Sequence, residues 1–342
     1  MSRWISLLAS LLACAAAHAH HSQAGLFDPN ETIEVTGTVK SVSWQNPHGH
    51  IVFTVVDDSG KAVDWDAETA SVSVLRIRGI DTVQLKPGDK ISVAGSPSRR
   101  GQPELLAKSM LLPSGYEFTF GSQTPYFPAG KAGKVFSKGV IDADAAKARA
   151  AADGLFRVWS TIMSDPAAFP MFKGGYPINA AAKAKIAQWN PRDNPLLKCG
   201  TKGQPLIMIS PLPMEFVKQD NGDILLKIEE YDVRRMIYMA PNAVAPPTEF
   251  TQFGFSRGHW EGTTLVVVTD HIREQPFEPD GVPQSQQMTT VERFVPTAAY
   301  DRIDYRITVT DPTYFEKPFD LTRYFVWKPE NTVHPYECSE RY

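Results

Sequence analysis

Several features that would mark a particular kind of protein are scarce in this sequence. Lysine plus arginine number 35 and aspartate plus glutamate 38, so the net charge of -3 gives no electrostatic reason to expect a nucleic-acid partner. After the N-terminal segment no run reaches the roughly 18 apolar residues of a membrane-spanning helix, so we expect none. A Gly-x-Ser-x-Gly elbow, a phosphate loop, a dinucleotide fingerprint and a His-Glu-x-x-His motif are all missing. A Ser-His-Asp triad stays open, because such triads have no fixed spacing.

The N-terminus has the pattern of a secretory signal peptide. Arg3 is a short basic region, and residues 5–17 are apolar. Ala17 and Ala19, on either side of His18, are the small residues that a signal-peptide cleavage site requires. We expect cleavage after Ala19, which makes residues 1–19 the signal peptide and places the mature chain in the periplasm or outside the cell. Cleavage after Ala17 is an alternative. A loose lipobox ending at Cys14 leaves a lipoprotein open as well.

Cysteine is also scarce, with three in the chain. Cys14 leaves with the signal peptide, so Cys199 and Cys338 remain, an even number in an oxidising compartment. This favours one structural disulfide that ties the end of the chain to the start of its domain. The alternative is a reactive thiol.

Residues 20–112 predict a small β-barrel domain. Alternating apolar residues indicate strands at 32–44, 50–56, 63–67, 90–94 and 104–112, with a short helix at 69–78. Three strands, a helix and two strands are the element order of the OB barrel. Within the first strand the apolar parity switches near Lys40, which predicts a β-bulge.

The motifs of this part resemble a known family. They are His20-His21-Ser22, Phe27-Asp28, Thr36-Gly37-Thr38-Val39, Trp44-Gln45-Asn46-Pro47-His48 and Lys86-Pro87-Gly88-Asp89. Together they resemble secreted bacterial proteins catalogued as domain of unknown function 6152, over about residues 20 to 120. The resemblance implies export and a fold but no reaction. Gln23 and Ala24 stand where that family has an aromatic residue.

Histidines are concentrated in the same part of the chain. His48 and His50 are two apart, so on a strand they share a face, and His20 and His21 would begin the mature chain. Imidazole and amine nitrogens suit copper, nickel and zinc. His20, His21, His48 and His50 are therefore a candidate site for copper or another transition metal. The alternative is a frayed terminus followed by a turn.

Residues 113–153 predict a linker with a short helix at 142–152, and residues 154–342 predict a second β domain. The second part has a short helix at 179–188 and eight or nine candidate strands, one pair of them flanking the Asn221-Gly222 hairpin signal. This pattern favours an antiparallel β-barrel, lipocalin-like, or a sandwich. Its motifs resemble the C-terminal part of uncharacterised exported bacterial proteins; they are residues 258–267, 292–294, 311–312, 317–318 and 337–340.

One arginine of the second domain lies on an otherwise apolar strand face. Arg235 shares its parity with Val233 and Ile237, and a buried arginine needs a partner, either Glu229, Glu292 or a ligand carboxylate. As ligand-binding residues we predict Arg235, His259, Trp260, Glu292 and Arg306, with His259 and Glu292 also the candidate catalytic residues.

Three functions fit these observations. The first is an exported binding protein that holds a small, partly apolar molecule in the C-terminal barrel, with the metal at the N-terminal histidines. The second is a periplasmic lyase, isomerase or hydrolase that uses acid/base residues in that barrel, and the third is a structural or envelope-assembly role. A cavity of about 300–1,000 Å³ containing at least two of Arg235, His259, Glu292 and Arg306 would support binding or catalysis. A filled interior would favour the third function.

Overall fold

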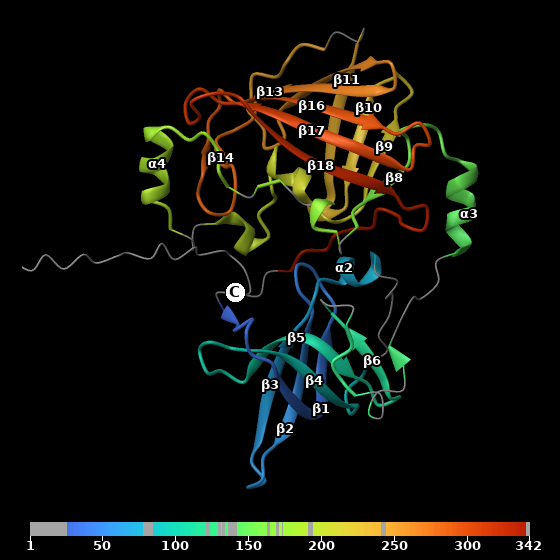
Figure 1. Ribbon diagram of the computed structural model, residues 1–342, viewed down its shortest axis with the longest axis vertical. Coiled ribbons are helices and arrows are strands. Elements are labelled where there is room, and N and C mark those ends of the chain that lie inside the picture. The colour runs from blue at the N-terminus through green and yellow to red at the C-terminus, as the bar shows by residue number, and fades with distance from the viewer. Residues whose placement is uncertain are drawn as a thin grey trace, which may run out of the picture.

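Two β-barrels lie end to end in the computed structural model of the chain (Figure 1). The structure describes residues 26–77, 85–120, 124–128, 131, 134–135, 142–162, 165–168, 171–172, 174–190, 194–240 and 244–339. The expected signal peptide, His20 and His21 lie outside these residues. Among the helices within them, none is long and apolar enough to cross a membrane.

The first barrel has the expected OB-like order. Its elements are β1 (Ile33–Ser43), β2 (His50–Val56), β3 (Ala62–Glu68), α2 (Val72–Ile77), β4 (Lys90–Pro97) and β5 (Glu104–Leu111). β1 pairs with β2 and β4, β2 pairs with β3, and β4 pairs with β5. A parallel pairing of β3 with β5 closes the barrel. The register of β1 against β2 shifts between Val39 and Ser41, where the change of parity predicts a bulge.

β1 and β2 approach each other closely at Gly37, over the core of the first barrel. Ile51 and Phe53 are fully buried between the strands. At Gly37 of β1, a Cβ atom would lie 2.6 Å from the carbonyl oxygen of Thr54 and 2.7 Å from the Phe53 ring. Only glycine therefore lets β1 approach β2 this closely.

The segment expected to be a linker is partly built into the first sheet. β6 (Tyr116–Thr119) pairs with β5, and β7 (Lys134–Val135) pairs with β6, so the sheet continues past residue 112. Buried aromatic side chains, among them Phe118 and Phe127, hold this extension in place without a regular apolar period. The expected helix of the linker is α3 (Asp142–Ala150).

The second domain is a closed barrel of nine strands and not a sandwich. The strands are β8 (Val158–Ser160), β9 (Met214–Lys218), β10 (Ile224–Ile228), β11 (Val233–Met239), β12 (Phe255–Glu261), β13 (Thr264–Asp270), β16 (Thr289–Pro296), β17 (Arg302–Thr310) and β18 (Phe319–Trp327). β9 and β10 form the expected hairpin, and β18 pairs with β8.

One pair of neighbouring strands, β11 and β12, runs parallel, which corrects the expectation of a wholly antiparallel barrel. The physical reason is the number of strands: strand directions cannot alternate around a closed ring of odd size. The alternation of residues 249–255 predicts a strand there, but β12 begins only at Phe255.

Short elements complete the second domain. They are η1 (Pro166–Ala168), α4 (Ala180–Ala187), η3 (Pro195–Lys198), η4 (Leu206–Ile209), η5 (Glu230–Asp232) and the hairpin of β14 (Gln275–Pro276) with β15 (Pro283–Gln284). Asn179 caps α4 by accepting a hydrogen bond from the Ala182 amide, as expected. In Figure 1 the red C-terminal tail, residues 328–339, runs between the barrel and the first domain.

Candidate functional site

A hydrogen-bonded ion pair lies inside the second barrel. Arg235 of β11 and Glu292 of β16 are 2% and 0% exposed, and the Arg235 guanidinium binds the carboxylate through two nitrogens, with Nη1 3.1 Å from Oε1. Arg235 also donates from Nε to Ser256 Oγ at 2.9 Å and from Nη2 to Thr269 Oγ1 at 2.7 Å. The Tyr305 hydroxyl donates to Glu292 Oε1 at 2.9 Å. The partner of Arg235 is thus Glu292.

This network is enclosed by the barrel wall. Burial raises the pKa of Tyr305 well above its ordinary value, so its hydroxyl keeps the proton it donates. Trp159, Phe216 and Phe294 are fully buried in the same core. Around the pair the interior is therefore packed side chain against side chain, and the Glu292 carboxylate is occupied by Arg235 and Tyr305.

Two of the predicted site residues lie on the outer wall instead, which corrects the expectation that four side chains converge. His259 is half-exposed, with Nε2 3.3 Å from Glu261 Oε1. Arg306 is 60% exposed. The reason is the register, in which Glu292 faces Ile307 across β16 and β17, so that Arg306, one residue earlier, points outward.

Trp260 lies at the end of β12 and is 42% exposed. Its ring packs edge-on against Phe156, with 6.3 Å between centroids. The structure therefore brings Arg235 and Glu292 together but separates His259, Trp260 and Arg306 from them.

A second buried arginine is one that our reasoning from sequence missed. Arg323 of β18 is 4% exposed and donates to the carbonyl oxygens of Met208 at 2.6 Å and Ser210 at 3.1 Å, and to Thr161 Oγ1 at 2.6 Å. Its guanidinium carbon lies 4.2 Å from the centroid of the Phe325 ring. Burial lowers the pKa of Arg323 to about 10, so the side chain stays cationic at neutral pH. Arg323 lies on the same strand face as the apolar Leu321 and Phe325. An arginine on an apolar face is the same signal that led us to predict Arg235, and it could have found Arg323 as well.

A small hollow lies beyond the carbonyl groups that Arg323 binds, and Arg323 itself does not line it. About 170 Å³ there is not filled by protein atoms, and none of it is wide enough for a water molecule. All of its lining residues except Ser210 are apolar; the others are Ile207, Met208, Leu212, Met214, Ile228 and Phe325. This space is smaller than the cavity we expected, and none of the four predicted residues lines it. Two of the lining residues, Met208 and Ser210, also accept hydrogen bonds from Arg323.

The histidines of the first domain each lie beside a carboxylate of β3. His48 Nδ1 is 3.4 Å from Glu68 Oε1, and His50 Nδ1 is 3.2 Å from Asp66 Oδ1. In the described part of the chain, no three or more His, Cys, Asp or Glu side chains gather closely enough to hold a metal ion. His20 and His21 lie outside the described residues, so the metal site stays a prediction.

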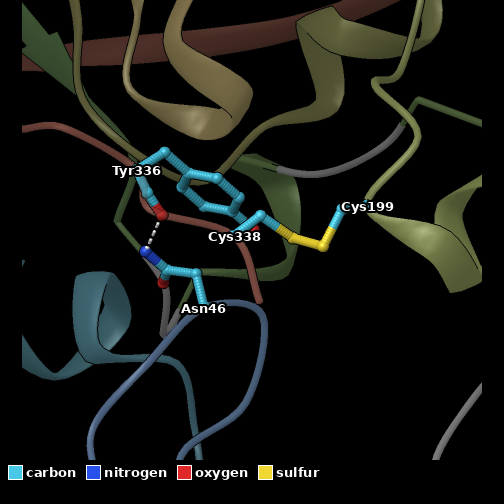
Figure 2. The surroundings of a disulfide bond; sticks show 4 residues. All are labelled: Asn46, Cys199, Tyr336 and Cys338. Atoms are coloured by element: carbon cyan, nitrogen blue, oxygen red, sulfur yellow. Dashed lines mark hydrogen bonds between the residues drawn. A yellow bond between two sulfur atoms is a disulfide. The ribbon is translucent and has the colours of Figure 1, made fainter. Parts of the chain in front are cut away.

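Cys199 and Cys338 form the expected disulfide, with Cα atoms 6.0 Å apart. Figure 2 shows that it lies at the seam between the two domains, next to Asn46 of the Trp-Gln-Asn-Pro-His motif. Asn46 is 1% exposed and donates from Nδ2 to the Tyr336 carbonyl oxygen at 2.5 Å. The Ser339 amide donates to the Asn46 carbonyl oxygen at 3.0 Å. The first domain thus holds the tail on one side.

The second barrel holds the tail on the other side. Glu229 Oε2 accepts the His334 amide at 3.1 Å, and the Asp232 carboxylate accepts the Tyr336 amide at 3.1 and 3.2 Å. Arg76 Nη1 of the first domain lies 3.4 Å from Glu229 Oε1. Burial raises the pKa of Glu229, against the opposing effect of its hydrogen bonds and of Arg76.

Comparison with known proteins finds a family match in the N-terminal part of the chain. Residues 8–107 match the model of a family of unknown function, DUF6152. The resemblance read from the motifs of the N-terminal part is therefore confirmed. No curated protein matches the chain.

Among solved structures, apo TiaS, a tRNAIle2 agmatidine synthetase, matches with 15% sequence identity. The match covers 24% of this chain and 18% of that one, with a TM-score of 0.18. A likeness this limited carries no argument about fold or function.

Proposed function

We propose that this chain is an exported binding protein that takes a small amphiphilic anion into the second barrel beside Arg323. The observation that carries the proposal is a buried, cationic arginine next to an apolar hollow, two of whose lining residues accept its hydrogen bonds. As it stands the hollow is closed to water, so a ligand must open it by moving side chains, and a hollow that never opens would leave the structural role. The N-terminal signal pattern and the disulfide support export.

The chemistry of the hollow defines the ligand. Its apolar lining favours a short hydrocarbon portion, because burying apolar surface is favourable by about 25 cal/mol per Å². The Arg323 charge favours a carboxylate or a similar anion, since attraction between charges is strong where water is excluded. Entry requires Met208 and Met214 to move, and methionine side chains adapt their shape readily.

Acid/base catalysis has less support from the arrangement. Glu292 is enclosed with Arg235 and Tyr305, whereas His259 lies on the outer wall beside Glu261. A general acid and a general base must both reach one substrate. The barrel wall stands between these two side chains, so binding is the function that the geometry supports better.

The test uses the methionines as reporters. In the oxidised full chain with 13C-labelled methionine methyl groups, hexanoate is expected to shift the Met208 and Met214 signals, with a Kd of about millimolar for so small a ligand. Met236, outside the lining of the hollow, is the internal control. Hexanol tests the charge without any change to the protein, and it should bind at least about tenfold more weakly.

Two outcomes would overturn the proposal. Equal shifts with hexanol and hexanoate would remove the role of Arg323. Shifts of neither Met208 nor Met214 at saturating hexanoate would leave the barrel as a filled scaffold, which is the structural role. Arg323→Lys, which keeps the charge, should retain part of the response, and Arg306→Lys on the outer wall should leave it unchanged.

A further inference from the structure

The contacts at the seam show how the two domains are joined. Asn46 of the first domain binds the tail through its side chain and its carbonyl oxygen. The barrel binds the same tail through Glu229 and Asp232. The tail therefore lies between the domains and binds both, beside the direct contact of Arg76 with Glu229 (Figures 1 and 2).

The tail is held largely by its main chain. The His334, Tyr336 and Ser339 amides and the Tyr336 carbonyl oxygen all take part in the bonds to the two domains. The Tyr336 side chain adds to these bonds: it is 4% exposed, and its ring centroid lies 4.9 Å from that of Tyr231. A chain end is expected to fray unless it is tied down.

The disulfide is the covalent restraint on the tail. Cys338 lies between Tyr336 and Ser339, the two residues that bind Asn46, and it is bonded to Cys199 of the barrel domain. Both cysteines are only partly buried, so a reductant can reach the bond.

We propose that the tail is a redox-sensitive clamp: the Cys199–Cys338 disulfide keeps the tail in place, and the tail in turn holds the OB-like domain against the barrel. Reduction opens the clamp and uncouples the domains, while each barrel stays folded. The disulfide expected from the sequence only ties the end of the chain to its own domain, whereas the clamp also couples the two domains. The clamp does not depend on a ligand in the barrel.

The opening step is thiol–disulfide exchange with a dithiol reductant. A thiolate of the reductant attacks one sulfur of the disulfide, the Cys199–Cys338 bond breaks, and a mixed disulfide forms. The second thiol of the reductant then displaces that cysteine. Two electrons pass to the protein, Cys199 and Cys338 take up protons as thiols, and the reductant leaves as a disulfide.

Hydrogen exchange and small-angle scattering on the full chain test the clamp. Reduction, or the Cys199→Ser/Cys338→Ser variant, is expected to speed exchange of the Tyr336 and Ser339 amides about tenfold or more. The radius of gyration should rise at the same time. Protection of β13, in the core of the barrel, should not change.

Two results would overturn the inference. Unchanged exchange of the tail in the reduced protein would mean that hydrogen bonds alone seat it. Loss of protection in β13 would mean that the disulfide maintains the barrel and not the domain arrangement.

Asn46→Ala gives an independent check, because it leaves the disulfide in place. It should speed exchange at Ser339 and raise the radius of gyration further when combined with reduction. The matched control is Asn221→Ala, in the β9–β10 hairpin of the barrel, which should change neither measurement. An Asn46→Ala protein that behaves like wild type in both redox states would also contradict the clamp.

Discussion

Replacing Glu292 with glutamine tests whether the buried ion pair stabilises the second barrel. The substitution keeps the shape of the side chain but removes the charge that faces Arg235 inside the barrel. Arg235 would then keep its bonds to Ser256 and Thr269 but face no carboxylate. Breaking one side of a buried pair costs about 3–5 kcal/mol. Because glutamine still accepts a hydrogen bond, we expect the lower end, about 3 kcal/mol of the free energy of unfolding.

The assay is urea denaturation of the oxidised full chain at neutral pH, followed by tryptophan fluorescence. Trp159 is fully buried in the core of the same barrel and reports its unfolding. The matched control is Glu261→Gln, which makes the same chemical change in the half-exposed pair of Glu261 with Arg293 on the outer wall. There we expect no measurable change, since exposed pairs contribute little.

A double variant completes the design. Arg235→Met with Glu292→Leu removes both charges, and well-packed apolar replacements of buried pairs are often neutral or stabilising. It should therefore recover most of the stability lost in Glu292→Gln. A loss below about 1 kcal/mol in the single variant, or a double variant as unstable as the sum of the two single variants, would refute the reasoning.

Three other predictions concern the seam, the first barrel and processing. Burial raises the pKa of Glu229 above its ordinary 4.5, so the folded state favours its protonated form, and that contribution to stability is present below the ordinary pKa and lost as pH rises through the raised value. Glu229→Gln should therefore gain stability relative to wild type as pH is raised from about 4 to about 7, and a difference that does not change with pH would contradict this. Gly37→Ala should destabilise the first domain by about 1–3 kcal/mol in calorimetry, because its Cβ meets the Thr54 carbonyl oxygen, whereas Thr38→Ala on the exposed face should not. The intact mass of the exported protein should correspond to a chain that begins at His20; a start at His18 or a lipid on Cys14 would show different processing.

Local patterns in the sequence were sufficient for much of the fold. Alternation with a period of two depends only on near neighbours, and it located most strands of both barrels and even the bulge after Val39. The order of elements was enough for the OB-like barrel, because few topologies accept three strands, a helix and two strands. The pairing of Cys199 with Cys338 followed from their number and the expected compartment.

Alternation also showed that Arg235 lies on an inward face, and the requirement for a partner reduced the choice to Glu229, Glu292 or a ligand. It did not decide between them. That choice depends on which inward-facing side chains meet inside the barrel, here of residues 57 positions apart, and no local pattern carries this information. Glu229 instead lies at the seam beside Arg76.

Only the tertiary structure decided which residues share a site. The motif of residues 258–267 favours a functional role for His259, but β12 begins at Phe255 and its register against β13 turns His259 outward. Nine strands closed the barrel with one parallel pair, which depends on the whole ring. Arg323 next to its hollow, and the tail between Asn46 and Asp232, join segments far apart in the chain. The sequence by itself determined the faces of individual strands, because side-chain direction is local; which faces meet is set by register and closure, which are properties of the whole fold.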